Sequence, residues 1–97
     1  MALVTGAGQG IGRELALELA KFGAIVICVD IRQETNEETM RLIQGMRGLA
    51  FAYTCDVSNR EEVEEMQRAI KSEVGDVSIL VNNAGVLACR PFLQVIL

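Results

Sequence analysis

The sequence predicts an α/β fold, a doubly wound parallel sheet with helices on both faces. Apolar runs alternate with segments of helical periodicity along the 97 residues, in the order β-α-β-α-β-α-β. Hydrophobic residues make up 51% of the chain and aromatic residues only 4%, which suits strands buried on both faces. A chain of this length forms one domain or part of one, and no linker or repeat indicates an internal boundary.

The first strand is expected at residues 2–5, and a helix should follow from Ile11. Apolar residues recur there at helical spacing and predict one buried face, formed by Ile11, Leu15, Leu19 and Phe22. Gly23 stands where glycines commonly end helices. The next apolar run, residues 24–29, is closed by Asp30 and predicts a buried second strand.

A second helix is expected over residues 34–44, where two apolar side chains point inward, Met40 and Ile43. Two glycines should break this helix, Gly45 and Gly48. Residues 49–54 then predict a third strand, which leads into Cys55 and Asp56.

Ser58 and Glu61 have the spacing of a capping box, in which Ser58 caps the third helix. The core stripe of that helix is expected to be Val63, Met66, Ile70 and Val74. Gly75 closes it, and residues 77–81 predict a fourth strand beside the first. That strand would be a bare apolar edge, and the apolar residues 95–97 add a further segment prone to association, so we expect the chain to be poorly stable and prone to associate.

Charge and composition exclude several classes of function. The net charge is −4, the isoelectric point is near 4.7, and the basic residues are scattered singly, which argues against nucleic acid or an anionic membrane as a partner. Histidine is absent, so a His-based triad or a His-ligated metal is excluded for these residues. The longest apolar run, residues 22–29, is far shorter than the roughly 18 residues of a membrane helix.

Three widely separated cysteines fit neither a disulfide framework nor a metal site. They predict a reducing compartment, and we expect an intracellular, cytoplasmic protein. Cys28 lies within a predicted strand and should be a buried apolar residue, whereas Cys89 lies in a predicted loop and is the candidate for reactivity.

A glycine-rich loop joins the first strand to the first helix. Gly6, Gly10 and Gly12 permit a tight turn and let an anion approach the backbone, and the helix N-terminus directs unpaired N–H groups toward it. The hydroxyl of Thr5 is expected to brace this turn. The sequence therefore predicts a site for nucleotide phosphates, with a glycine-rich turn that binds no ligand as the alternative.

Four motifs follow the four predicted strands: Thr5-Gly6-x-x-x-Gly10-x-Gly12, Asp30, Asp56-Val57 and Asn82-Asn83-Ala84-Gly85. In this order they resemble the short-chain dehydrogenase/reductase family. The resemblance covers residues 1 to about 93 and implies a Rossmann-like fold that binds NAD or NADP. Residues 1–97 would then be the N-terminal part of a single NAD(P)-binding domain, truncated before its catalytic half.

The resemblance assigns cofactor binding to eleven residues: Thr5, Gly6, Gly10, Ile11, Gly12, Asp30, Asp56, Val57, Asn82, Ala84 and Gly85. Asp30 should accept from the adenosine ribose hydroxyls and repel a 2′-phosphate, which favours NAD over NADP, although Arg32 would soften that preference. By resemblance Asp56 faces the adenine amino group; alternatively it caps its own turn. The segment 82–85 would line the cofactor's ribose, with a simple turn as the alternative.

The family's proton-transfer groups, a Ser and a Tyr-x-x-x-Lys pair, are missing from the chain, and Tyr53 has no Lys four residues later. Residues 1–97 alone are therefore expected to be inactive. The sequence of residues 76–86 resembles that of the retinol and 17-beta hydroxysteroid dehydrogenase group. This resemblance implies that a longer parent protein oxidises or reduces a lipid alcohol or carbonyl. It also implies a homo-oligomer, associated with membranes or lipid droplets through an N-terminal segment ahead of Met1.

A second function of a different class stays open. The chain could be a non-catalytic truncated product, or a nucleotide-binding or interaction module that keeps the glycine loop without the reaction. Genomic sequence beyond Leu97 would distinguish the two, because only the enzyme needs Ser and Tyr-x-x-x-Lys about 50–70 residues further on, as the resemblance implies.

Overall fold

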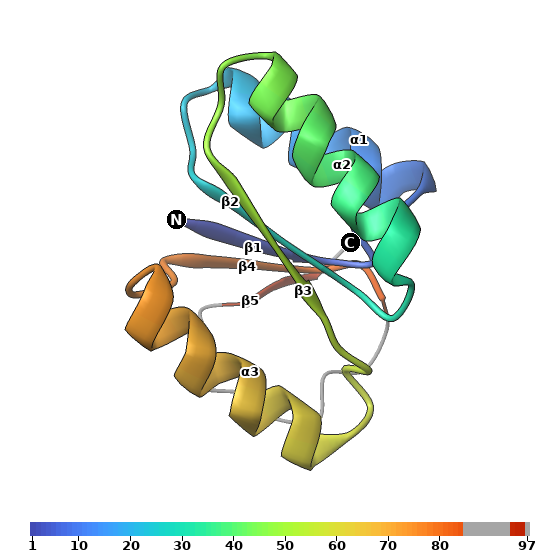
Figure 1. The fold of residues 1–97 in the computed structure, drawn as a ribbon, viewed down its shortest axis with the longest axis vertical. Helices are drawn as coiled ribbons and strands as arrows, with labels where there is room; N and C mark the ends of the chain where they lie inside the picture. Colours follow the sequence, from blue (N-terminus) through green and yellow to red (C-terminus); the bar gives the residue numbers. More distant parts are fainter. Residues whose placement is uncertain (85–93, 97) are drawn as a thin grey trace.

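The computed structural model describes residues 1–84 and the backbone of residues 94–96. The order of elements is β1 (Ala2–Thr5), α1 (Gly10–Lys21), β2 (Val26–Asp30), α2 (Gln33–Gly45), β3 (Ala50–Thr54), α3 (Arg60–Glu73), β4 (Ile79–Asn82) and β5 (Gln94–Ile96). The strands of these described residues pair in parallel in one sheet, in the order β3-β2-β1-β4-β5 (Figure 1). The predicted α/β class is confirmed, and so is the pairing of the first strand with the fourth.

The prediction that β4 forms a bare edge is wrong. β5 pairs with β4 in parallel, from Leu80 opposite Gln94 to Asn82 opposite Ile96. β4 therefore lies between two strands. The expected instability and association of the chain stay predictions, but an exposed β4 no longer supports them. The pairing depends on where residues 94–96 lie in three dimensions, which a short apolar segment does not specify locally.

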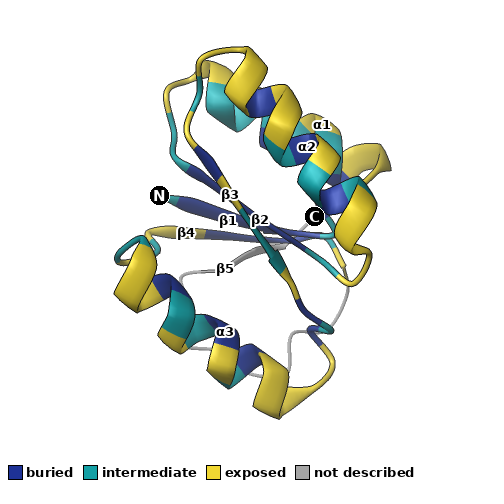
Figure 2. Cartoon of the chain, viewed as in Figure 1, coloured by how far each residue is buried: buried dark blue, intermediate teal, exposed yellow. Residues whose placement is uncertain are grey.

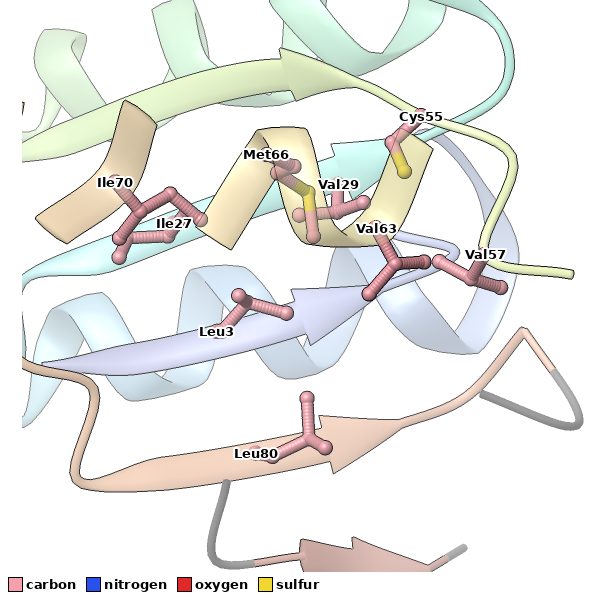
Figure 3. Packing of buried hydrophobic residues seen from close by; sticks show 9 residues of the cluster. All are labelled: Leu3, Ile27, Val29, Cys55, Val57, Val63, Met66, Ile70 and Leu80. Carbon is pink, nitrogen blue, oxygen red and sulfur yellow. The ribbon is translucent and has the colours of Figure 1, made fainter. Parts of the chain in front are cut away.

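The sheet separates two apolar cores. α1 and α2 cover one face and α3 covers the other (Figure 1), with buried positions on the helix sides that face the strands (Figure 2). The α3-side core (Figure 3) comprises Leu3, Ile27, Val29, Cys55, Val57, Val63, Met66, Ile70 and Leu80. The α1/α2-side core comprises Val4, Ala7, Ala16, Val26, Cys28, Ile43, Ala50 and Val81. Adjacent strand residues contribute to opposite cores because strand side chains alternate between faces.

The core stripe of α3 is confirmed at three of its four positions, whereas the predicted cap of the helix is wrong by one residue. Val63, Met66 and Ile70 are buried, but Val74 is half-buried at the C-cap. Asn59 caps the helix, and its side chain accepts a hydrogen bond from the N–H of Glu62 at 3.1 Å. Ser58 instead belongs to the preceding turn. Ser and Asn are both good caps, so the sequence did not discriminate between neighbouring candidates.

The predicted buried face of α1 is partly wrong. Ile11 is 67% exposed and Phe22 is 85% exposed, whereas Gly12 and Ala16 are buried. A Cβ atom on Gly12 would lie 1.9 Å from the carbonyl oxygen of Gly6, so α1 approaches the loop too closely for a larger side chain. The remaining two predicted core residues are half-buried, Leu15 and Leu19. Small residues therefore make the contact that we expected large ones to make.

The C-terminus of α2 also differs from the prediction. The helix includes Gly45, and the residue with left-handed backbone is Arg47, at φ 66°. Gly48 has a packing role instead, because a Cβ atom there would lie 2.7 Å from Cγ2 of Ile43. Gly23, by contrast, ends α1 with φ 89°, as predicted.

Within the described part of the chain, no helix has the length and apolar character needed to cross a membrane.

Candidate functional site

Polar residues end the parallel strands on one edge of the sheet, where α/β folds bind ligands. A pocket of about 140 Å³ lies there, lined by Gly6, Val29, Asp30, Ile31, Cys55, Asp56, Val57 and Ala84. It brings together five of the eleven predicted site residues, contributed by the segments after β1, β2, β3 and β4. Whole ligand sites span roughly 300–1,000 Å³, so this pocket has room for one part of a dinucleotide.

The glycine loop leaves space in front of the N-terminus of α1. Gly6 and Gly10 have left-handed backbone, with φ 68° and 60°, and a Cβ atom on Gly10 would meet nothing within 4 Å. Gln9 is the N-cap residue, but its side chain makes no capping hydrogen bond, and the first turn contains no acidic residue. Open space, a positive helix end and uncapped N–H groups together fit the phosphates of a dinucleotide.

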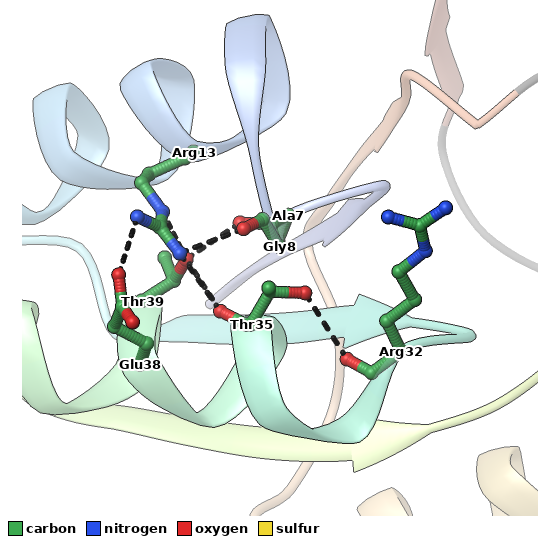
Figure 4. A network of polar contacts seen from close by, with 7 residues as sticks. All are labelled: Ala7, Gly8, Arg13, Arg32, Thr35, Glu38 and Thr39. Atoms are coloured by element: carbon green, nitrogen blue, oxygen red, sulfur yellow. Dashed lines mark hydrogen bonds and ion pairs between the residues drawn. The ribbon is translucent and has the colours of Figure 1, made fainter.

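Asp30 is joined to the glycine loop. Its Oδ2 accepts a hydrogen bond from the N–H of Gly8 at 2.8 Å, and its Oδ1 accepts from the N–H of Arg32 at 3.0 Å. A carboxylate offers about four acceptor positions, so each oxygen can still accept a hydroxyl. In Figure 4 no dashed line joins the guanidinium of Arg32 to the other residues drawn.

Asp56 caps its own turn, the arrangement that we gave as the alternative. Its Oδ1 accepts from the N–H of Ser58 at 3.0 Å and from the Ser58 hydroxyl at 2.6 Å. These hydrogen bonds lower the pKa of the Asp56 carboxyl below its ordinary value. Since Asp56 also lines the pocket, contact with adenine stays a prediction.

Thr5 ties two strands together and does not brace the glycine turn as expected. Its hydroxyl donates to Oδ1 of Asn82 at 3.1 Å and accepts from the N–H groups of Asn83, at 3.0 Å, and Ala84, at 3.1 Å. The end of β1 is thereby joined to the last residue of β4 and to the two residues that follow it. Gly85, the last predicted site residue, lies outside the described residues.

Arg13, on α1, holds the glycine loop and was not predicted as a site residue. Its Nη2 donates to the carbonyl oxygens of Gly8, at 2.7 Å, and Thr35, at 3.0 Å (Figure 4). Its Nε donates to Oγ1 of Thr39 at 2.9 Å, and its Nη1 forms an ion pair with Glu38 at 2.8 Å. One guanidinium thus connects α1, the loop and α2.

Thr39 provides a second connection between α2 and the loop. Its hydroxyl is fully buried and donates to the carbonyl oxygen of Ala7 at 2.7 Å. The Ala7–Gly8 segment is therefore held from α1 by Arg13 and from α2 by Thr39. No local sequence pattern predicts this network, because an isolated arginine on a helix is typical of a solvated face.

The described thiols and the tyrosine are poor proton-transfer groups at neutral pH. Burial raises the pKa of Cys28 to about 12, and burial together with Glu62 and Asp56 raises the pKa of Cys55 to about 11. Burial and the hydrogen bond to Glu73, at 2.6 Å, raise the pKa of Tyr53 to about 12. Cys28 is buried as predicted, while Cys89 lies outside the described residues.

Comparison with protein families and curated proteins gives consistent matches. A family model described as short chain dehydrogenase matches residues 1–96. Epidermal retinol dehydrogenase 2 of Mus musculus is 49% identical over 95 residues, which are 97% of this chain and 31% of that protein. Human 17-beta-hydroxysteroid dehydrogenase 13 is 46% identical over 85 residues, 88% of this chain and 28% of that protein. The chain spans about three tenths of the length of these relatives.

Solved structures share the fold at similar coverage. A metagenomic short-chain oxidoreductase in complex with NADP has a TM-score of 0.83 and 34% identity, covering 89% of this chain and 38% of that one. An oxidoreductase from Haemophilus influenza with bound NAD has a TM-score of 0.83 and 30% identity, covering 88% of this chain and 30% of that one. Both cofactor types therefore occur among proteins similar to this chain.

Proposed function

The chain belongs to the short-chain dehydrogenase family, and from that premise we propose that it binds the dinucleotide of an NAD(P)-dependent oxidoreductase that interconverts an alcohol and a carbonyl compound. The single observation that carries the proposal is the joining of Asp30 to the glycine loop beside the 140 Å³ pocket. A phosphate-binding helix end and a ribose-binding carboxylate would then belong to the same edge of the sheet and be joined by a hydrogen bond.

Each part of the dinucleotide has a place along this edge. The phosphates would lie against Gly10, Ile11 and Gly12 at the N-terminus of α1, where the helix dipole favours negative charge. The adenosine ribose would lie against Asp30, and the adenine beside Asp56 and the backbone of Val57. We propose NAD as the preferred cofactor, because a 2′-phosphate would face the Asp30 carboxylate with like charge.

When bound, the nicotinamide ring supplies or accepts the hydride. The 97 residues contain no Tyr-x-x-x-Lys, so we assign to them cofactor binding and not proton transfer. For the substrate we propose a lipid alcohol or its carbonyl partner, such as a retinoid or a steroid. The names of the relatives, a retinol dehydrogenase and a hydroxysteroid dehydrogenase, support this class.

Titration of the purified chain with NADH and NADPH, followed by fluorescence or calorimetry, tests the proposal. We expect NADH to bind at least about tenfold more tightly, a difference of about 1.4 kcal/mol. Asp30→Asn should remove this preference. Asp76→Asn is the matched control, since Asp76 is exposed in the loop before β4, and it should leave both affinities unchanged. Failure to bind either dinucleotide would refute the proposed function.

A further inference from the structure

Gly8 lies at the centre of the contacts that hold Asp30, yet it is not one of the spaced glycines of the Thr5–Gly12 motif. Its φ is outside the left-handed region that Gly6 and Gly10 occupy. Backbone conformation therefore does not explain a glycine at this position. The surroundings do, because the N–H of Gly8 donates to Asp30 and no space is left for a side chain.

A Cβ atom on Gly8 would lie 2.8 Å from Oδ2 and 3.0 Å from Cγ of Asp30, and 2.7 Å from Oγ1 of Thr35. Contacts this short force a neighbouring group to move. The Asp30 carboxylate is on a short side chain, and its other oxygen is held by the N–H of Arg32. Even a methyl group at position 8 would therefore displace the carboxylate and break its hydrogen bond to the loop.

The loop itself has little freedom to make room. The carbonyl oxygen of Gly8 accepts from Arg13 at 2.7 Å, and the carbonyl oxygen of Ala7 accepts from the buried Thr39 hydroxyl at 2.7 Å. A side chain at position 8 would have to break these two contacts, or push away both the Asp30 carboxylate and the Thr35 hydroxyl. Moving the side-chain groups next to position 8 requires a smaller rearrangement than moving the loop backbone.

We propose that Gly8 is a specificity-determining residue of the cofactor site. Its N–H holds the Asp30 carboxylate where it accepts from a free 2′-hydroxyl and repels a 2′-phosphate, and its lack of a side chain leaves room for that carboxylate. This inference rests on the proposed function, and it adds a residue through which the choice between NAD and NADP is set. If the carboxylate is displaced, the 2′-hydroxyl of NAD loses a hydrogen-bond acceptor and the 2′-phosphate of NADP is no longer repelled. The affinities for NAD and NADP therefore move toward each other.

The test compares Gly8→Ala with Gly45→Ala. Gly45 is a matched control, because it lies at the end of α2 without left-handed backbone and an added Cβ would meet nothing within 4 Å. We expect Gly8→Ala to lower the ratio of NADH to NADPH affinity at least about tenfold. Gly45→Ala should keep the wild-type ratio. A wild-type ratio in Gly8→Ala would overturn the inference.

Asp30→Asn separates failure of the inference from failure of the proposed function. If the wild-type chain binds neither dinucleotide, both fail. If Asp30→Asn abolishes the preference and Gly8→Ala does not, only the role of Gly8 fails.

If Gly8→Ala does not fold, a second measurement replaces it. The NMR chemical shift of the Gly8 amide is compared between the wild type and Asp30→Asn. A carboxylate acceptor makes a stronger hydrogen bond than an amide oxygen, so this resonance should shift more than that of Gly45. Equal shifts for the two glycines would overturn the inference.

Discussion

Thr5 and Asn82, the last residues of the neighbouring strands β1 and β4, are joined by a buried hydrogen bond of 3.1 Å from the Thr5 hydroxyl to Oδ1 of Asn82. The same hydroxyl accepts the N–H groups of Asn83 and Ala84. One oxygen atom therefore satisfies three polar groups where the sheet meets the candidate cofactor site.

Thr5→Val keeps the shape of the side chain and removes all three hydrogen bonds. We expect the free energy of unfolding to fall by about 1–3 kcal/mol, because buried polar groups lose their partner. Thr54→Val is the matched control: Thr54 ends β3 but is exposed, and its substitution should cost less than about 0.5 kcal/mol. Urea unfolding measures both. Equal losses in the two variants would contradict a special role for Thr5.

Asn36, on α2, forms hydrogen bonds with the strands β2 and β3. Its side-chain nitrogen donates to the carbonyl oxygens of Cys28, at 3.0 Å, and Tyr53, at 3.1 Å, and the residue is fully buried. Asn36→Ala should cost about 1–3 kcal/mol. Asn36→Asp should cost more at pH 7, because a buried carboxylate would face two carbonyl oxygens without a proton to donate.

The exposed Gln44 of the same helix provides the control for Asn36. Gln44→Ala should change the free energy of unfolding by less than about 0.5 kcal/mol. Chemical denaturation of the three variants ranks them. A loss in Asn36→Asp no greater than that in Gln44→Ala would exclude the contacts described.

Gly10 and Gly12 should respond differently to alanine. Gly12→Ala places a Cβ atom against the backbone oxygen of Gly6, so we expect it to cost at least the roughly 1–3 kcal/mol of overpacking. Gly10→Ala places the methyl group in open space, and its left-handed backbone should cost only about 1–2 kcal/mol. That methyl would nevertheless obstruct the phosphates and weaken NADH binding. Wild-type NADH affinity in Gly10→Ala would place the phosphates elsewhere.

Alkaline pH should destabilise the fold through the buried thiols. The pKa of Cys28 is about 12 and that of Cys55 about 11, whereas an unfolded cysteine has a pKa of about 8.5. The unfolded state therefore loses its protons first, and the stability contributed by the neutral thiols is complete below about pH 8.5 and is lost as pH rises toward 11 and 12. Urea midpoints between pH 7.5 and 10.5 measure the decline.

The double variant Cys28→Ala/Cys55→Ala isolates the contribution of the thiols, since other groups also titrate in this range. Its urea midpoint should fall less steeply with pH than that of the wild type. The same slope in both proteins would show that the thiols do not cause the decline.

The elements that the sequence predicted well are those with strong hydrophobic periodicity or a continuous apolar run. The buried stripe of α3 follows directly from apolar residues at helical spacing, and β2 from a continuous apolar run. The face of α1 was mispredicted because Gly12 and Ala16 are small, and hydrophobic periodicity gives weight to large side chains such as Ile11 and Phe22. Where a helix packs closely against its neighbours, small residues are needed at the contact and large ones do not fit.

The contacts at the candidate site depend on residues far apart in the sequence, and this limited what could be predicted. Asp30 and the glycine loop were identified from their motifs, but the bond between Asp30 and Gly8 was not. Arg13 and Thr39 were missed for the same reason, because each meets the loop only after α1 and α2 have packed on the sheet. Motif spacing identifies the groups, and tertiary packing decides their orientation.

The alternation of strand residues between the two cores also bears on how this sequence can change over evolutionary time. Leu3 and Val4 are adjacent in the chain, yet the strand backbone lies between their side chains, so each is constrained by a different set of neighbours. A volume change at Leu3 calls for compensation by α3, and one at Val4 calls for compensation by α1 or α2. The two layers are therefore free to accumulate substitutions as separate units, each adjusting within itself.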